Sequence, residues 1–242
     1  MSDQTIKKRE IVIKAESVSR CYPTSSGDFY ALRDVSAEIA KGEFVILKGR
    51  SGSGKTTLMN LIGTLDDSTS GTVYIDGKPV KGMPDYKREE LRRKRFGFVF
   101  QSVSLIPPLT AFENVEFTMR MAGIGPGKER DARVEECLKR VGLWNRRDHY
   151  PSEMSGGEQQ RVAIARALSP SPAILLADEP TAELDSAMAA TVAQLLQDIA
   201  HNDGITVLMT THDVGLMDAA DRIIELESGR MVTPQPQQGS QS

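Results

Sequence analysis

The sequence has few of the features that mark secreted, membrane-spanning or nucleic-acid-binding proteins. It contains only two cysteines, Cys21 and Cys137, which favours reduced thiols over a disulfide framework or a metal site. No apolar run approaches the roughly 20 residues of a transmembrane helix, and the N-terminus lacks the apolar core of a signal peptide. A formal net charge of −3 gives no general attraction for nucleic acid. We therefore expect a soluble cytoplasmic protein that binds no nucleic acid and reaches a membrane only through a partner.

Short apolar runs alternate with segments of helical periodicity along most of the chain. The apolar runs predict buried strands of a sheet that helices cover on both faces, at residues 44–48, 95–101, 173–178 and 206–210. Helical periodicity predicts the covering helices, at residues 54–63, 159–168 and 188–201. Together these patterns predict an α/β fold.

Two regions depart from this alternation. Residues 11–16 and 32–39 alternate apolar and polar side chains, which predicts an N-terminal antiparallel β subdomain. Residues 102–156 have helical periodicity without a strong strand, which predicts an inserted α-helical subdomain. We expect one domain over 1–232, with its α/β core at about 10–101 and 157–232, followed by a disordered polar tail at 233–242.

A glycine-rich loop follows the first apolar run and precedes a helical segment. It reads Gly49-Arg50-Ser51-Gly52-Ser53-Gly54-Lys55-Thr56 and matches the phosphate-loop pattern G-x-x-x-x-G-K-[ST]. Its glycines let backbone N–H groups surround an anion, and the helix that follows adds the positive end of its dipole. Lys55 supplies a charge for the outer phosphates, and the Thr56 hydroxyl suits Mg²⁺. The motif indicates a P-loop NTPase core with a mixed, mainly parallel sheet.

Two carboxylates, Asp178 and Glu179, follow the apolar residues 173–177. An acid at the carboxyl end of a buried strand lies where ligands bind in open α/β sheets. We expect Asp178 to hold Mg²⁺ through its water shell and Glu179 to act as the general base that polarises the attacking water. Pro180 ends the strand directly after this pair.

The segment Met154-Ser155-Gly156-Gly157-Glu158-Gln159-Gln160-Arg161 resembles the signature sequence of ABC ATPases, usually written L-S-G-G-Q. A Ser-Gly-Gly at a helix start offers an anion free N–H groups, a hydroxyl and a helix dipole. Taken alone, it could be a simple N-cap by Ser155. Together with the phosphate loop and the acidic pair it indicates an ATP-hydrolysing subunit, and the resemblance covers roughly residues 11–232.

The resemblance implies roles for further residues. Tyr22 lies where the family carries an aromatic that stacks on adenine, Gln101 matches a glutamine that contacts magnesium, and His212 matches a histidine that contacts the γ-phosphate. The expected catalytic residues are Lys55, Glu179 and His212, and the expected magnesium ligands are Thr56, Gln101 and Asp178. The expected ATP-binding residues are Tyr22, Gly49, Arg50, Ser51, Gly52, Ser53, Gly54, Lys55, Thr56, Thr57, Gln101, Ser155, Gly156, Gly157 and Glu158.

The family geometry also implies an ATP-dependent homodimer. Two subunits pack head to tail, so that ATP on one phosphate loop is clamped by the signature of the other subunit. Residues 182–185 resemble the loop that crosses to the partner. In the signature, Met154 replaces the usual Leu at nearly equal volume, and Glu158 replaces the usual Gln and adds a negative charge. Since Glu-Gln-Gln-Arg is ordinary in several bacterial subfamilies, we expect an active site.

Three hypotheses remain for the work that the ATPase drives. The chain could power a membrane transporter, serve DNA repair or translation as a soluble ATPase, or transmit force through a membrane, as in bacterial cell division. The soluble class is disfavoured because the segment between Gln101 and Ser155 is short and lacks heptads. Residues 89–101, 105–115 and 156–161 resemble the lipoprotein-releasing and macrolide-export subfamily, which also contains peptide exporters and the cell-division ATPase.

That subfamily resemblance implies a separate integral membrane permease that contacts the helical subdomain. The subunit would then lie on the inner face of the cell membrane. The segment after Gln101 would receive the permease, through Leu105, Ile106, Leu109 and Phe112, although packing inside the subdomain explains each of these equally well. The basic stretch 87–95 is interpreted as a solvated helix face rather than a lipid-binding patch. The resemblance also implies that substrate specificity lies in the permease.

Overall fold

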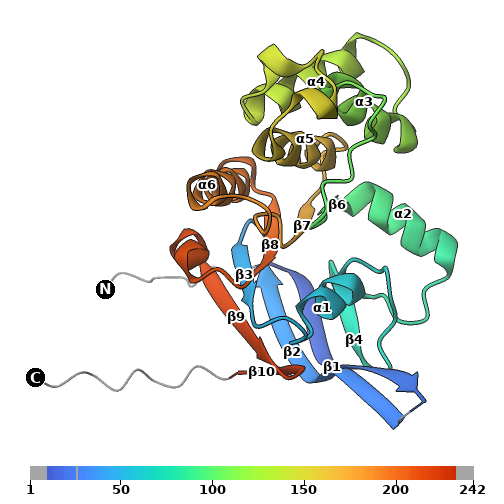
Figure 1. Ribbon diagram of the computed structural model, residues 1–242. Helices are drawn as coiled ribbons and strands as arrows, with labels where there is room; N and C mark the ends of the chain where they lie inside the picture. The colour runs from blue at the N-terminus through green and yellow to red at the C-terminus, as the bar shows by residue number, and fades with distance from the viewer. Residues whose placement is uncertain (1–9, 26, 233–242) are drawn as a thin grey trace, which may run out of the picture.

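The computed structural model describes residues 10–25 and 27–232, in which two sheets and two groups of helices are layered on one another (Figure 1). The predicted tail at 233–242 lies outside the described residues. The larger sheet has six strands in the order β10-β9-β3-β8-β7-β6. Its strands are β3 (Phe44–Lys48), β6 (Phe96–Val99), β7 (Ile174–Asp178), β8 (Thr206–Thr211), β9 (Arg222–Glu227) and β10 (Arg230–Met231).

The larger sheet is mixed and mainly parallel, as predicted. β3 pairs in parallel with β8 and β9, and β7 pairs in parallel with β6 and β8, whereas β10 is antiparallel to β9. Strands β3, β7 and β8 are buried along nearly their whole length, and β3 and β7 are accordingly almost continuous apolar runs, whereas β8 has threonines at both ends. β6 is shorter than the predicted 95–101, because Arg95 belongs to the preceding helix and Phe100 is exposed.

The smaller sheet is antiparallel, with the order β2-β1-β4-β5. Its strands are β1 (Ile11–Thr24), β2 (Gly27–Ala40), β4 (Ser70–Ile75) and β5 (Lys78–Pro79). β1 and β2 form a long hairpin that extends well beyond the predicted segments 11–16 and 32–39. Bulges interrupt the pairing of β1 with β2, so the strict alternation on which the prediction rested is lost toward the hairpin tip.

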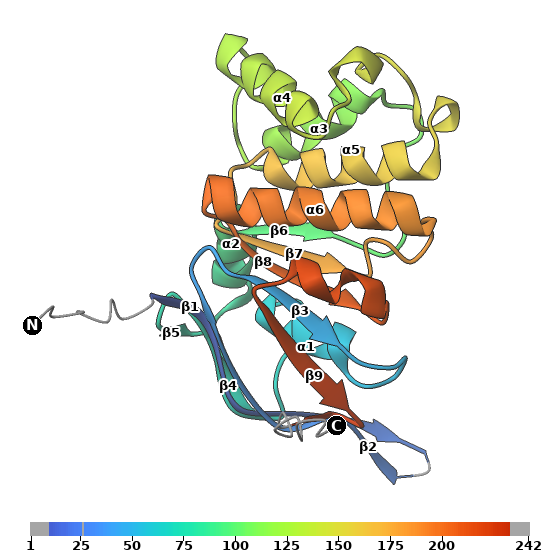
Figure 2. The same cartoon turned by 90° about the vertical axis from the view of Figure 1, so that its left-hand side faces the viewer.

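Helices cover both faces of the larger sheet. Helix α1 (Lys55–Ile62) lies between the two sheets, where apolar side chains of all three elements form one core. Helices α5 (Gly156–Leu168) and α6 (Ser186–Asp203) pack on the opposite face and form a second core. Figure 2 shows α6 between α5 and the strands. Helix α1 therefore lies in a different layer from α5.

The inserted subdomain is helical, as predicted. It contains α3 (Ala111–Met121), α4 (Lys128–Arg140) and the 3₁₀ turns η1 (Trp144–Arg146) and η2 (Pro151–Glu153). α5 packs against α3 and α4 as well as against β6, and it thereby joins the insertion to the sheet. A third 3₁₀ turn, η3 (Val214–Ala219), follows β8 and packs on α6. Within the described residues, no helix has both the length and the apolar character needed to cross a bilayer.

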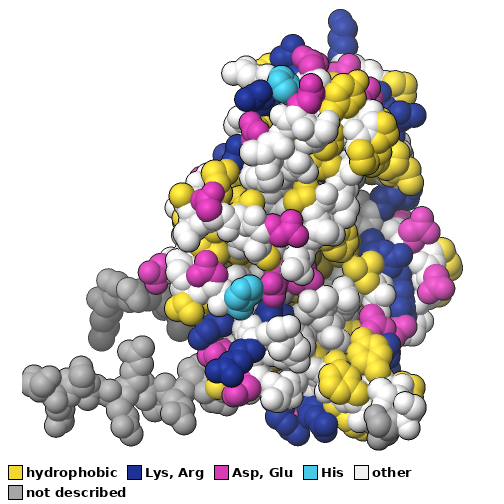
Figure 3. Space-filling model, viewed as in Figure 1, with side chains coloured by type: hydrophobic (Ala, Val, Ile, Leu, Met, Phe, Trp, Pro, Cys, Tyr) yellow, Lys and Arg dark blue, Asp and Glu magenta, His cyan; other side chains and the backbone are white. Residues whose placement is uncertain are grey.

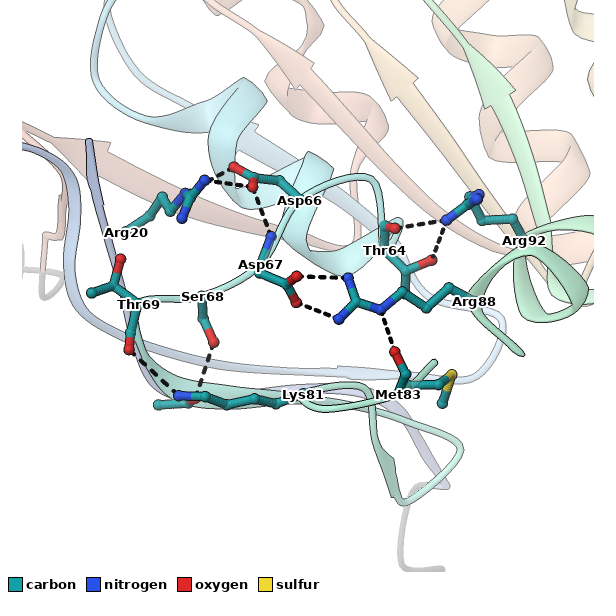
Figure 4. A network of polar contacts seen from close by, with 11 residues as sticks. Arg20, Thr64, Asp66, Asp67, Ser68, Thr69, Lys81, Met83, Arg88 and Arg92 are labelled. Carbon is teal, nitrogen blue, oxygen red and sulfur yellow. Dashed lines mark hydrogen bonds and ion pairs between the residues drawn. The ribbon is translucent and has the colours of Figure 1, made fainter. Parts of the chain in front are cut away.

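Polar contacts help to fix helix α2 (Asp85–Arg95) in place (Figure 4), and Leu91 packs against the core between the sheets. None of its residues, all of which are described, is buried, and the basic stretch 87–95 lies on this helix. Arg88 donates two hydrogen bonds to the Asp67 carboxylate, at 2.8 and 2.6 Å, and a third to the Met83 carbonyl at 2.9 Å. Arg92 donates to the carbonyl of Thr64 at 2.8 Å. The turn between α1 and β4 therefore sets the position of α2.

A buried asparagine holds the loop that leads into the helical subdomain. The Asn114 side chain accepts a hydrogen bond from the Ile106 N–H at 2.8 Å and donates to the carbonyls of Ile106, Leu109 and Thr110 at 3.2, 2.9 and 3.0 Å. Because the side chain is fully buried, no water replaces these bonds if it is removed.

Replacing this side chain tests its contribution. We expect Asn114→Ala to lower the free energy of unfolding by about 1–3 kcal/mol, because the part-buried backbone groups of Ile106 and Leu109 lose these hydrogen bonds. The exposed Asn145 offers a matched control, for which Asn145→Ala should change the value by less than about 0.5 kcal/mol. Urea unfolding measures both, and equal effects would show that backbone contacts alone hold the loop.

Candidate functional site

The phosphate loop connects β3 to α1 and approaches the antiparallel sheet closely. Gly54 has φ of 103°, and a Cβ at this position would lie 2.6 Å from the carbonyl oxygen of Ala31. At Gly49 a Cβ would lie 2.3 Å from the Ser53 hydroxyl oxygen. Both positions therefore need glycine for steric reasons. The loop leads directly into the N-terminus of α1, whose dipole favours an anion.

Lys55, the first residue of α1, is buried with only 5% of its surface exposed. Its ammonium group donates to the carbonyls of Gly49 and Arg50 at 2.9 and 3.2 Å. It also forms an ion pair with a carboxylate oxygen of Glu179 at 3.2 Å. The charge is therefore held within the loop, where an incoming phosphate would meet it.

The acidic pair is fixed by a threonine on the neighbouring strand. Asp178 ends β7 and lies opposite Thr210 of β8. The Thr210 hydroxyl donates to Asp178 at 2.6 Å and accepts the Glu179 backbone N–H at 2.8 Å. Glu179 has φ of 44°, in the left-handed region that non-glycine residues seldom adopt, and this hydrogen bond helps to stabilise it there. Thr56 donates to the same Asp178 oxygen at 3.3 Å.

His212 lies beside Glu179, on the side opposite Lys55. Its Nδ1 lies 3.3 Å from Glu179 Oε2, so one carboxylate contacts Lys55 through one oxygen and His212 through the other. The other two histidines lie elsewhere, His149 beside Arg146 and His201 beside Asp221. The structure thus brings together the three residues predicted to be catalytic, and leaves out the two histidines for which no role was predicted.

Lys55, Glu179 and His212 line a cavity of about 740 Å³. The predicted residues that line it are Arg50, Ser51, Gly52, Gly54, Lys55, Thr56, Thr57, Gln101, Glu179 and His212. Gly49 and Ser53 face a separate hollow on the other side of the loop, and Asp178 contributes through its contact with Thr56. Two of the predicted magnesium ligands, Thr56 and Gln101, therefore line the cavity, and the third, Asp178, contacts Thr56.

Tyr22 does not line this cavity. Its hydroxyl donates to Asp66 at 2.7 Å, and the guanidinium of Arg20 lies 4.5 Å from the centre of its ring. Instead Phe29, which is 56% exposed and lies opposite Tyr22 in the hairpin, lines the cavity. Sequence reasoning missed both Phe29 and Thr210, because each is identified only by the strand register that places it.

The signature residues lie at the N-terminus of α5. Ser155 caps this helix, and its hydroxyl accepts the Glu158 backbone N–H at 3.3 Å. The Glu158 carboxylate in turn accepts the Ser155 backbone N–H at 2.9 Å, which completes a capping box. Among the described residues that line the cavity, none belongs to the signature. The phosphate loop and the signature of one chain therefore lie at two separate helix N-termini.

The comparison with known families agrees with this geometry. The family model described as ABC transporter matches residues 32–182, which is more than half of the chain. The chain belongs to the ABC transporter family. It is an ABC ATPase, and both the α/β fold and the predicted resemblance to the lipoprotein-releasing and macrolide-export subfamily are confirmed.

Individual relatives place this ABC ATPase more closely. An uncharacterised ABC transporter ATP-binding protein, MJ0796 of Methanocaldococcus jannaschii, is 45% identical over 91% of this chain and 95% of its own length. The macrolide export ATP-binding/permease protein MacB of Mannheimia succiniciproducens is 43% identical over 91% of this chain. The chain spans only 34% of the length of that MacB.

A solved structure supports the fold. The dimeric structure of a post-hydrolysis state of the cassette MJ0796, bound to ADP and Pi, matches with a TM-score of 0.84 and 43% identity. The match covers 94% of this chain and 99% of the MJ0796 chain.

The role of Thr210 in this ABC ATPase can be tested directly. We expect Thr210→Val to lower kcat at least about tenfold with a smaller change in KM for ATP, because Asp178 and the Glu179 N–H lose their shared partner. Thr206→Val is the control, since Thr206 lies on the same strand with its hydroxyl bonded to Gly42 and Ala40, remote from the acidic pair. Steady-state ATPase assays on the folded variants measure both. Equal losses of kcat would contradict a specific role for Thr210.

Proposed function

We propose that this ABC ATPase powers a transporter by ATP-driven, head-to-tail closure of a homodimer. The observation that carries the proposal is the separation of the phosphate loop and the signature within one chain. The phosphate loop lines the cavity, whereas Ser155 and its neighbours lie at the start of α5, in another layer of the fold (Figure 2). A two-fold pairing would bring each signature to the phosphate loop of the other copy. The dimeric MJ0796 structure with ADP and Pi supports this arrangement.

The contacts of Lys55 support an assignment of roles within the site. ATP phosphates on the loop would attract Lys55, which now contacts Glu179 at 3.2 Å. Glu179 would then be free to polarise the attacking water, with His212 on its other oxygen. The hydroxyl of Thr56 and the carboxylate of Asp178, together with nearby Gln101, form an oxygen donor set that fits Mg²⁺. When bound there, Mg²⁺ would neutralise charge on the phosphates.

An apolar groove supports the proposal of a membrane permease as partner. The groove has a volume of about 660 Å³ and lies between α2, β6, α3 and α5. Exposed Leu65, Phe100, Phe117 and Met121 line it, and Met121 is 65% exposed. Figure 3 shows hydrophobic side chains gathered near α3. Exposed apolar surface of this kind typically marks a protein–protein contact.

The predicted permease contacts fall into two groups. Ile106 lines the groove, whereas Leu105 is buried in the core of the helical subdomain. Leu109 and Phe112 are half-buried and do not line the groove. We therefore propose that a cytoplasmic helix of the permease binds between α2 and α3, which would hold the subunit on the inner face of the cell membrane.

The class of transporter is proposed from the relatives. MacB proteins, whose name gives them both ATP-binding and permease parts, match this chain at 42–43% identity. MJ0796, an ATP-binding protein, matches over nearly its whole length. We infer an exporter of the lipoprotein-release or macrolide and peptide efflux type.

Glu179→Gln tests the closure mechanism. We expect this variant to bind ATP and remain dimeric, with hydrolysis at least about 100-fold slower, because the neutral amide cannot accept the proton of water. Size-exclusion chromatography with light scattering measures the dimer, and phosphate release measures hydrolysis. Adding Ser155→Arg should leave monomers that still bind ATP. A monomeric Glu179→Gln variant in saturating ATP would contradict the closure mechanism.

Met121→Glu tests the groove. A charge on this exposed side chain should reduce co-purification with membranes at least about fivefold, because burying it against an apolar partner is unfavourable. ATPase activity of the isolated subunit should be unchanged. Tyr86→Glu is the control, since Tyr86 is exposed on α2 but does not line the groove. Unchanged membrane recovery of Met121→Glu would argue against this surface as the permease site.

A further inference from the structure

The signature of this ATPase carries a carboxylate where the proposed function brings in a polyphosphate. Glu158 lies in the first turn of α5, three residues after Ser155, and its side chain is only 19% exposed. In the proposed closed dimer this turn faces the γ-phosphate of the partner's ATP. Like charges at short range repel, so a compensating group is needed beside Glu158. The inference below rests on that proposed closure.

The carboxylate also competes for the hydroxyl that would bind the phosphate. Ser155 Oγ donates its single proton to Glu158 Oε2 at 3.1 Å, and the same oxygen accepts the Ser155 backbone N–H at 2.9 Å. The backbone bond from Ser155, assisted by the charges of Arg146 and Arg161, lowers the pKa of Glu158. Glu158 is therefore ionised at neutral pH and is a strong acceptor. A phosphate oxygen must displace it to receive the Ser155 proton.

Arg146 reaches Glu158 from outside the helix. It ends η1, and its Nε lies 3.4 Å from Glu158 Oε1, the carboxylate oxygen that the capping box leaves open. Its Nη1 lies 3.0 Å from Nε2 of His149. Because a guanidinium can only donate, that histidine nitrogen accepts, and the contact helps to orient Arg146.

We propose that Arg146 is a positioning residue of the composite ATP site. Arg146 pairs with Glu158 Oε1 and so offsets the charge of the carboxylate. This weakens the hydrogen bond that Glu158 Oε2 accepts from the Ser155 hydroxyl. The partner's γ-phosphate can then take that proton. A glutamine at position 158 would be neutral and would need no such partner, so the effect of Arg146 depends on Glu158 being a carboxylate.

A double-mutant cycle in the Glu179→Gln protein tests this dependence. The measured quantity is the ATP concentration at half-maximal dimer, from light scattering. We expect Arg146→Gln to raise it about threefold, because each of two equivalent sites loses about threefold and the dimer binds two ATP. In a Glu158→Gln background the same change should have less than about a twofold effect. Arg146→Lys, which keeps the charge, should restore most of the loss.

Two controls separate positioning from folding. Arg147→Gln removes the same charge one residue away, where Arg147 pairs with Asp148 at 3.3 Å and lies 4.7 Å from the Trp144 ring, and it should not change dimer formation. Binding of a fluorescent ATP analogue to the Ser155→Arg monomer, with and without Arg146→Gln, should be equal, because Arg146 does not line the cavity. A purely structural role for Arg146 would weaken this monomer binding as well.

The outcomes are distinct. This inference would be overturned if Arg146→Gln had the same effect with Glu158 intact and in the Glu158→Gln background. It would also be overturned if Arg146→Gln had no effect in either protein. Both results would leave the proposed closure intact. Failure of the parent Glu179→Gln protein to dimerise with ATP would instead overturn the proposed function, and this inference with it. A loss confined to the protein with Glu158 intact, rescued by Arg146→Lys, would support it.

Discussion

The ion pair between Lys55 and Glu179 depends on the order of three parallel strands. β8 lies between β3 and β7, and the pairings of Lys48 with Thr211 and of Asp178 with Thr210 bring their carboxyl ends level. The residues that follow these ends therefore converge on one point, as in open α/β sheets generally. A buried ammonium group is costly without partners, and here two loop carbonyls and one carboxylate supply them. The same charge is thus available to an incoming phosphate, which can take the place of the carboxylate.

Most of this arrangement could be predicted from the sequence, because its determinants are local. A strand buried on both faces must be apolar along its length, so β3 was predicted with its observed bounds. The phosphate loop is recognisable because two of its glycines are required sterically, at Gly49 and Gly54. The antiparallel hairpin was predicted too short, because bulges and exposed positions near its tip erase the alternation.

The remaining site residues are determined by pairings that are distant in sequence. Thr210 is an ordinary buried strand residue until the register places it opposite Asp178. Phe29 lines the cavity because it lies across the hairpin from Tyr22, whose hydroxyl bonds to Asp66 instead. Arg146 is an exposed cation in a 3₁₀ turn, and only the packing of the helical subdomain brings it to Glu158. No spacing rule along the chain contains this information.

Glu158 in the signature both stabilises the start of α5 and binds the hydroxyl that the proposed closure requires. Thr110 and Glu113 form the same capping box at the start of α3, away from the cavity, so a glutamate at this helical position is favourable without any nucleotide. At α5 the Glu158 carboxylate accepts, besides the bond of the box, the hydroxyl proton of Ser155 that closure would require. Breaking that hydrogen bond costs on the order of 1 kcal/mol at each site, which the γ-phosphate contact must exceed. Once phosphate leaves, the hydrogen bond from the Ser155 hydroxyl to Glu158 can re-form, and this bond would favour reopening of the dimer.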